Sequence, residues 1–94
     1  MATLHIEHKV NNYDDWKRSF DNDPADRKGS GVRTYRVSRS AADDSVVRIE
    51  LDFDDLASAE AMHEKLKQVW AGPAADVVNN PIAAVFDNVE TVEL

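Results

Sequence analysis

Residues 45–53 read SVVRIELDF, with apolar and polar side chains in alternation. Side chains two apart on a β-strand point to the same side, so this period predicts a strand with one apolar and one charged face. The apolar face is expected to hold Val47, Ile49, Leu51 and Phe53. The other face is expected to hold Val46, Arg48, Glu50 and Asp52. The stretch therefore predicts a sheet that buries only one of its faces.

Two flanking stretches share this alternation. Residues 32–39 place Tyr35 and Val37 on their more apolar side, and the polar turn at residues 40–44 joins them to residues 45–53 as a hairpin. Residues 3–10 alternate as well, which predicts a further strand. Its apolar side is expected to hold Leu4, Ile6, His8 and Val10, and its polar side Thr3, His5, Glu7 and Lys9.

Two helices are predicted between the strands. Asn12, with Asp15 three residues later, is typical of a helix N-cap, and the apolar stripe that follows is aromatic. That stripe consists of Tyr13, Trp16 and Phe20. Asp54 and Asp55 suit the start of a second helix, which runs to Gly72. Residues 74–81 are expected to form a loop or one turn, and residues 82–94 a last strand.

The predicted order is therefore βαββαβ in a single domain of residues 1–94. This order is that of the ferredoxin-like α+β fold, in which one antiparallel sheet carries both helices on one face. A chain of 94 residues buries a modest share of its surface, and its sequence has no cysteine to form a disulfide or a thiolate metal site. We therefore expect stability to come from packing and from a homodimer.

Composition excludes several partners. The formal net charge is −7, which disfavours binding to nucleic-acid phosphates. No stretch reaches 18 consecutive apolar residues and the N-terminus lacks an apolar signal core, so neither membrane insertion nor secretion is expected. The absence of cysteine fits a cytoplasmic protein. No phosphate-binding loop or other cofactor motif is present, so no cofactor is expected.

Several segments resemble the dimeric α+β barrel superfamily, and in particular its small antibiotic-biosynthesis-monooxygenase-like proteins, many of them uncharacterised. The matching segments are residues 8–10, 13–17, 20–21, 31–32, 39, 43–44, 53–54 and 57–66. The resemblance covers residues 3–70 and weakens beyond residue 71. It implies that two sheets pack face to face across a dimer, often with the last strand reaching the partner.

The charged face of the sheet is the first candidate site. His5 and Glu7 share that face, and a carboxylate beside a histidine can make it a general base. Arg36, Arg48 and Glu50 lie on the same face, and an arginine there could hold an anionic oxygen. The alternative is a polar layer of compensating charges with no chemistry.

His8 is the second candidate. It lies on the apolar side of its strand, close in sequence to Tyr13 and Trp16. Such a histidine is commonly part of the edge of a core. The resemblance implies another role, at the mouth of a pocket between sheet and helices. His5 and His8 point to opposite faces, so they cannot share a metal ion, and no metal site is expected.

A basic stretch runs from Arg27 and Lys28 through Arg33 and Arg36 to Arg39. Ordinary salt bridges to the acidic second half of the chain explain it better than a phosphate site.

Three functions remain open. One is a cofactor-independent monooxygenase-like or isomerase-like enzyme acting on a small organic molecule, with catalysis by His5, Glu7, His8 and Arg48 and ligand binding by Tyr13, Trp16, Arg36 and Glu50. The second is a non-catalytic dimer that binds a small ligand or serves in stress, and the third is a purely structural module.

Overall fold

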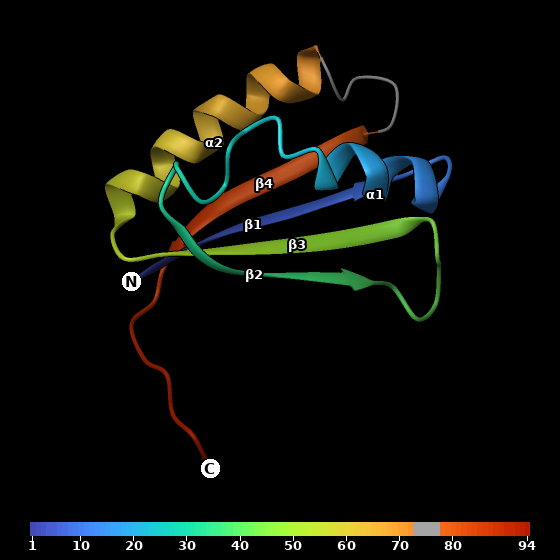
Figure 1. Cartoon of the computed structure of the whole chain (residues 1–94). Coiled ribbons are helices and arrows are strands. Elements are labelled where there is room, and N and C mark those ends of the chain that lie inside the picture. Colours follow the sequence, from blue (N-terminus) through green and yellow to red (C-terminus); the bar gives the residue numbers. More distant parts are fainter. Residues whose placement is uncertain (73–77) are drawn as a thin grey trace.

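The computed structural model describes residues 1–72 and 78–94 and has the predicted βαββαβ order (Figure 1). The elements are β1 (Ala2–Lys9), α1 (Tyr13–Asp21), β2 (Val32–Arg39), β3 (Val46–Phe53), α2 (Leu56–Ala71) and β4 (Asn79–Asp87). The part of the predicted loop at residues 74–77 lies outside the described residues.

The four strands form one antiparallel sheet in the order β2-β3-β1-β4 (Figure 1). Both helices cover the same face of this sheet, as the ferredoxin-like fold requires. The register places Leu4 opposite Leu51 and Ile6 opposite Ile49. Because paired residues point to the same side, the apolar sides of β1 and β3 meet under the helices.

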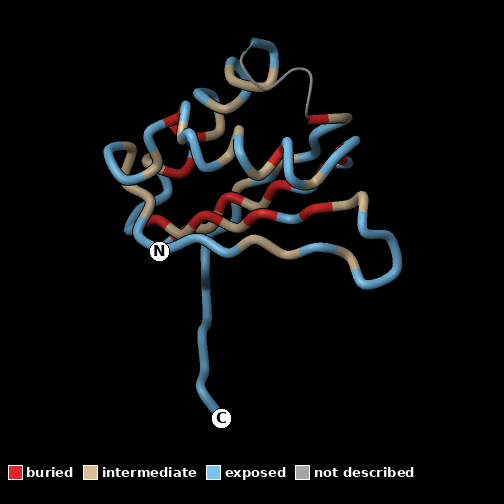
Figure 2. The backbone as a smooth tube through the Cα atoms, turned by 45° about the vertical axis from the view of Figure 1, so that its right-hand side comes forward, coloured by how far each residue is buried: buried red, intermediate tan, exposed pale blue. Residues whose placement is uncertain are grey.

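The core lies between this inner face of the sheet and the helices, where the buried parts of the tube gather in Figure 2. All four apolar residues predicted for β3 are buried, at 0–2% exposure. Trp16 is the buried residue of α1, and Ala59 and Met62 are those of α2. The opposite, outer face of the sheet carries the charged side chains of β1 and β3, and Arg36 of β2 lies there opposite Glu50, as the alternation predicted.

Both predicted helix starts are confirmed. The side-chain oxygen of Asn12 accepts a hydrogen bond from the backbone N–H of Asp15 at 3.0 Å. The carboxylate of Asp55 accepts one from the N–H of Ser58 at 2.7 Å. Each bond satisfies an N–H group that the helix itself leaves unpaired, which explains why these residues fix the helix boundaries.

The segment between α1 and β2, residues 22–31, consists of turns and forms a wall beside α1. Asp23 and Asp26 adopt left-handed backbone conformations, with φ of 54° and 49°. The Asp23 carboxylate accepts a hydrogen bond from the N–H of Arg27 at 2.9 Å, and Asp26 accepts one from the N–H of Gly29 at 3.2 Å. Aspartate tolerates this conformation because its short side chain bonds to nearby backbone groups.

The prediction of a last strand over residues 82–94 is wrong at both ends. β4 begins at Asn79, and residues 88–94 have no strand structure. The reason lies in the strand that pairs with β4: β1 pairs with it from Lys9 opposite Asn79 to Ala2 opposite Asp87, which is the whole length of β1. The remaining residues form a C-terminal tail that leaves the sheet on the side away from the helices (Figures 1 and 2).

Candidate functional site

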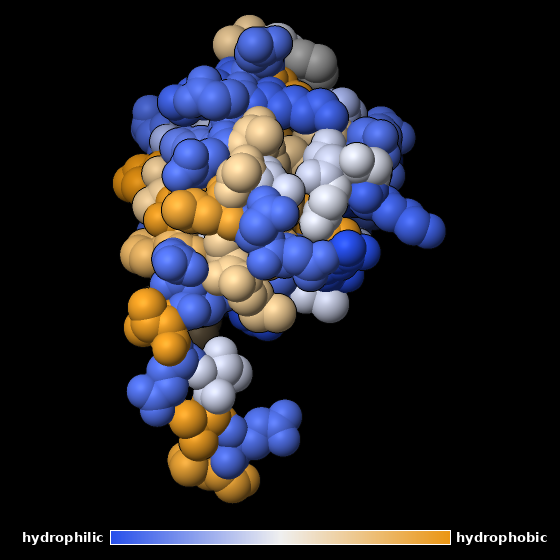
Figure 3. Space-filling view, turned by 90° about the vertical axis from the view of Figure 1, so that its left-hand side faces the viewer, coloured by the Kyte–Doolittle hydropathy of each residue, from blue (hydrophilic) through white to orange (hydrophobic). Residues whose placement is uncertain are grey.

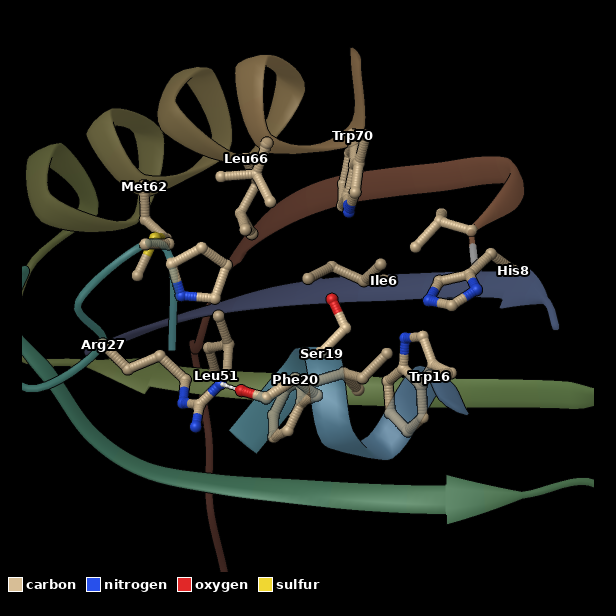
Figure 4. A pocket seen from close by; sticks show the side chains of 15 residues that line it. Ile6, His8, Trp16, Ser19, Phe20, Arg27, Leu51, Met62, Leu66 and Trp70 are labelled. Carbon is tan, nitrogen blue, oxygen red and sulfur yellow. Dashed lines mark hydrogen bonds between the residues drawn. The ribbon is translucent and has the colours of Figure 1, made fainter. Parts of the chain in front are cut away.

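A pocket of about 60 Å³ lies between the inner face of the sheet and the helices (Figure 4). Its walls come from β1, α1, the segment 22–31, β3, α2 and Val78, and most of its lining is apolar. The volume exceeds what one water needs but is smaller than the roughly 150 Å³ of an apolar cavity that holds benzene. A ligand with an aromatic ring would therefore require its walls to move outwards.

A few polar groups face this apolar space. His8 lies at one end, beside Trp16, and the Ser19 hydroxyl points towards Ile6 (Figure 4). Trp70, from the end of α2, points its indole nitrogen down into the same space. A mostly apolar pocket with a small number of convergent polar groups is typical of sites for small organic molecules.

His8 is a polar side chain enclosed in the core, with 4% exposure. Its Nδ1 lies 3.2 Å from the carbonyl oxygen of Lys9. A carbonyl can only accept, so Nδ1 carries the hydrogen and Nε2 keeps a lone pair. Within residues 1–72 and 78–94, the hydrogen bond of the ring is the one at Nδ1, and Nε2, which has no partner there, is not sealed off completely from solvent.

Burial lowers the pKa of His8 from its ordinary value, and the bond to the Lys9 carbonyl opposes this effect only in part. The physical cause is desolvation, which disfavours the charged imidazolium. The ring is therefore neutral at pH 7, with Nε2 able to accept a proton. It packs edge-on against Trp16, with ring centroids 5.6 Å apart, so its orientation is fixed.

Aromatic rings form a row along α1 and onto β2. Trp16 lies 5.7 Å from Tyr13 and 5.2 Å from Phe20, and Phe20 lies 5.4 Å from Tyr35, measured between ring centroids. Trp16 and Phe20 line the pocket, whereas Tyr13 packs against Trp16 without lining the pocket itself. The guanidinium of Arg39 lies over the Tyr13 ring at 4.7 Å. Tyr13 therefore supports the pocket wall from outside.

The other predicted site residues lie together on the outer face of the sheet. There the Glu50 carboxylate accepts a hydrogen bond from Nη2 of Arg36 at 3.1 Å and lies 3.8 Å from Nε of Arg48. The side chains of both arginines are more than half exposed. His5 packs edge-on against Phe86 of β4 at 6.3 Å. Glu7 shares this face with His5, yet in the part of the chain that the structure describes no hydrogen bond joins the two. The predicted residues thus fall into two groups on opposite sides of β1.

The described residues contain no cluster of three or more His, Asp or Glu side chains placed to hold a metal ion. No described helix is long and apolar enough to cross a membrane.

The basic stretch forms salt bridges to the second half of the chain, as expected: Arg33 pairs with Asp54 at 2.5 Å, and Arg36 pairs with Glu50. Arg27 instead pairs with Asp23, inside the first half.

Sequence reasoning missed several residues that line the pocket. Ser19 follows Trp16 by three positions and therefore shares its side of α1. Met62 and Trp70 belong to the predicted second helix, and no pattern distinguishes them as pocket residues. Arg27 is predicted only as a member of the basic stretch. The helical spacing could have flagged Ser19, but no local pattern marks Arg27.

No protein-family model and no curated protein sequence matches the chain. Solved structures match along nearly its whole length. SnoaB, a cofactor-independent oxygenase from Streptomyces nogalater, has a TM-score of 0.73 at 14% identity, over 97% of this chain and 95% of that one. An antibiotic biosynthesis monooxygenase has a TM-score of 0.68 at 10% identity, over 96% of this chain and 100% of that one.

A dimeric ferredoxin-like protein from an uncultured marine organism has a TM-score of 0.70 at 8% identity, over 99% of this chain and 98% of that one. Together these likenesses confirm the expected ferredoxin-like fold, which the chain shares with these proteins. At such low identity they establish the fold alone, because one fold carries many activities.

Proposed function

We propose that the pocket binds a small, largely apolar aromatic molecule and that Nε2 of His8 removes a proton from it. The observation that carries this proposal is a largely buried, neutral imidazole with an unoccupied lone pair in a mostly apolar pocket. A general base works best when it is unprotonated at working pH and held in place. The Lys9 carbonyl and the Trp16 ring hold His8 in this way.

The reaction suited to such a base is a cofactor-independent oxygenation. Removal of a proton from an activated CH₂ group leaves a delocalised carbanion, which can pass electrons to O₂. Formation of a C–O bond and loss of water then convert R₂CH₂ and O₂ into R₂C=O and H₂O. The likeness to SnoaB supports this choice, since that protein is a cofactor-independent oxygenase of the same fold. Isomerisation by proton transfer needs the same base and no O₂.

Binding is tested with probes of increasing size: phenol, 2-naphthol and anthrone. Because Trp16 and Trp70 line the pocket, an occupant should change the intrinsic fluorescence. We expect saturable changes in fluorescence, and the size of the probe that binds most tightly reports how far the pocket walls can move apart. No saturable change with any of the three probes would contradict the proposed pocket.

Catalysis is tested by oxygen uptake with anthrone, whose CH₂ group is acidic. His8→Gln keeps hydrogen-bonding groups but no base, so uptake should fall about 10²-fold or more while 2-naphthol binding changes little. His63→Gln, which alters an α2 residue outside the pocket lining, is the matched control. Unchanged uptake in His8→Gln would remove His8 from the reaction.

A non-catalytic binding protein is the second candidate, favoured by the apolar character of most of the pocket lining. It predicts probe binding in the wild type without any oxygen uptake or proton transfer. The two candidates therefore differ in the uptake measurement and agree in the fluorescence measurement.

We further propose that two copies of the chain associate through the outer face of the sheet. β4 exposes Ile82 and Phe86 on this face, at 69% and 55%. The C-terminal tail, residues 88–94, exposes three more apolar side chains. Those side chains are Val89, Val92 and Leu94. In Figure 3 the tail extends away from the body of the protein, with apolar and polar residues both visible along it. A tail of this kind gains stability only by covering another surface.

In this arrangement the tail of each copy lies on the other copy, and His5, Glu7, Arg36, Arg48 and Glu50 face the interior between two sheets. The dimeric state named for one protein of the same fold supports this arrangement.

Light scattering should give twice the chain mass at micromolar concentration. A chain ending at Asn88, which keeps the bond from the Asn88 N–H to the Met1 carbonyl, should shift towards the monomer. A monomeric full-length chain would rule the association out.

A further inference from the structure

Arg27 closes the end of the pocket opposite His8 (Figure 4). It also lines a surface groove of about 380 Å³ on its other side. The groove is otherwise lined by Asp23, Lys28, Val32, Arg33 and Tyr35. Arg27 is the residue that the two linings share, so its side chain separates the aromatic pocket from the polar groove.

The guanidinium of Arg27 is held in a fixed position. It lies 3.9 Å from the ring centroid of Phe20 and 5.0 Å from that of Tyr35. Its Nη1 donates a hydrogen bond to the Phe20 carbonyl at 2.7 Å, drawn as a dashed line in Figure 4, and its Nε lies 3.4 Å from the Asp23 carboxylate. The side chain is 15% exposed. A preorganised, largely desolvated guanidinium is a strong partner for an anion.

The charges around Arg27 leave room for such an anion. The groove lining contains three cations and one carboxylate, in a chain whose net charge is −7. The Asp23 carboxylate already accepts the backbone N–H of Arg27, and Arg33 is bonded to Asp54. Within the described ranges, Nη2 of Arg27 has no hydrogen-bond partner. With Arg27 paired to Asp23 and Arg33 to Asp54, the excess positive charge of the groove is that of Lys28, next to Arg27, and Nη2 of Arg27 is free to donate to an anion.

We propose that the molecule bound in the pocket is an aromatic carboxylate, with its carboxylate on Arg27 and its ionisable position at His8. This inference rests on the proposed function, since it uses the same pocket. It assigns Arg27 as the residue that determines specificity and sets the orientation of the ligand. Phe20, which contacts both the pocket and Arg27, links the aromatic part of the site to the charged part.

The test compares 6-hydroxy-2-naphthoate with its methyl ester, which has the same ring system and no charge, and with 2-naphthol. Tryptophan fluorescence titration of the full-length chain should show that the acid binds about tenfold more tightly than the ester, which corresponds to about 1.4 kcal/mol. Raising NaCl from 0.05 M to 0.5 M should reduce this ratio, because a partly exposed ion pair is screened.

Arg27→Met replaces the charge with an apolar chain of similar length. It should bring the acid-to-ester ratio close to one while 2-naphthol binding changes by less than about threefold. Arg18→Met is the matched control, since Arg18 is exposed, bonded to Asp15 on α1, and outside both linings. It should leave the ratio at its wild-type value.

Three results would overturn parts of this reasoning separately. Failure of the wild type to bind any probe, 2-naphthol included, would refute the proposed pocket function. Binding of 2-naphthol with no preference for the acid over the ester would refute the anion site alone. A preference that survives in folded Arg27→Met would place the anion elsewhere. If Arg27→Met does not fold, the wild-type acid-to-ester ratio and its salt dependence still decide.

Discussion

Acidification from pH 7.5 to pH 5 should destabilise the protein through His8. In the unfolded chain the imidazole has its ordinary pKa near 6.5, whereas burial lowers its pKa in the folded protein. Well above pH 6.5 both states are neutral and this residue contributes no pH dependence. Below it the unfolded state binds a proton that the folded state does not, so the free energy of unfolding falls as pH falls.

The magnitude follows from proton linkage. One proton bound only by the unfolded state gives a limiting slope of about 1.4 kcal/mol per pH unit, from pH 6.5 down to the folded-state pKa. The free energy of unfolding of a small domain is about 5–15 kcal/mol, so even one pH unit of this slope is measurable. Below the folded-state pKa the loss stops growing, because both states are then protonated.

The assay is urea denaturation followed by tryptophan fluorescence at pH 7.5, 6.5, 6.0, 5.5 and 5.0, at one fixed protein concentration. His8→Gln cannot titrate, so its stability should lose this slope. Hydrogen bonds lower the pKa of three carboxyl groups, those of Asp43, Asp55 and Glu64. Their contribution to stability is lost only below about pH 4.5, outside the pH range of this assay. His63→Gln should behave as the wild type.

The decisive quantity is the difference in free energy of unfolding between the wild type and His8→Gln at each pH. It should shift only slightly against the wild type from pH 7.5 to 6.5 and more steeply on further acidification. A difference that stays constant down to pH 5 would show that His8 is not held neutral by burial. The proposal that it acts as a base at neutral pH would then lose its physical basis.

Three further outcomes are expected in the same denaturation assay. Asn12→Ala should cost about 1 kcal/mol, because it removes the bond that caps α1. Leu51→Ala, at 2% exposure, should cost about 2–5 kcal/mol, whereas Leu56→Ala, at 42%, should cost clearly less. Arg36→Ala should change the stability of a monomeric chain little, because the ion pair is exposed, and a marked loss that depends on protein concentration would indicate that a partner covers the outer face.

Most of the fold could be predicted from local sequence patterns. The alternation of residues 45–53 fixed which side of β3 is buried, and Asn12 and Asp55 marked the helix starts. The length of β4 could not be predicted in the same way. Its own residues permit a longer strand, but pairing stops where β1 ends, so the limit is set by residues about 80 positions away in sequence.

The candidate site was only partly predictable. Strand parity correctly assigned His5 and His8 to opposite faces of β1. It could not show that the free nitrogen of His8 meets a pocket, because the walls come from segments far apart in sequence. Arg27 has no periodic pattern around it, and its place between the pocket and the groove results from the turns of residues 22–31.

The central position of β1 has a consequence for synthesis on the ribosome. β1 is the first strand to emerge, but its two neighbours in the sheet are β3 and β4, and β4 is the last of the four strands. Until residues 79–87 have been made, one edge of β1 keeps unpaired backbone N–H and C=O groups, which can form hydrogen bonds with strands of other chains. Shortening β4 should therefore lower the yield of folded protein more than shortening β2 at the opposite edge of the sheet, because it leaves an edge of the central strand unpaired.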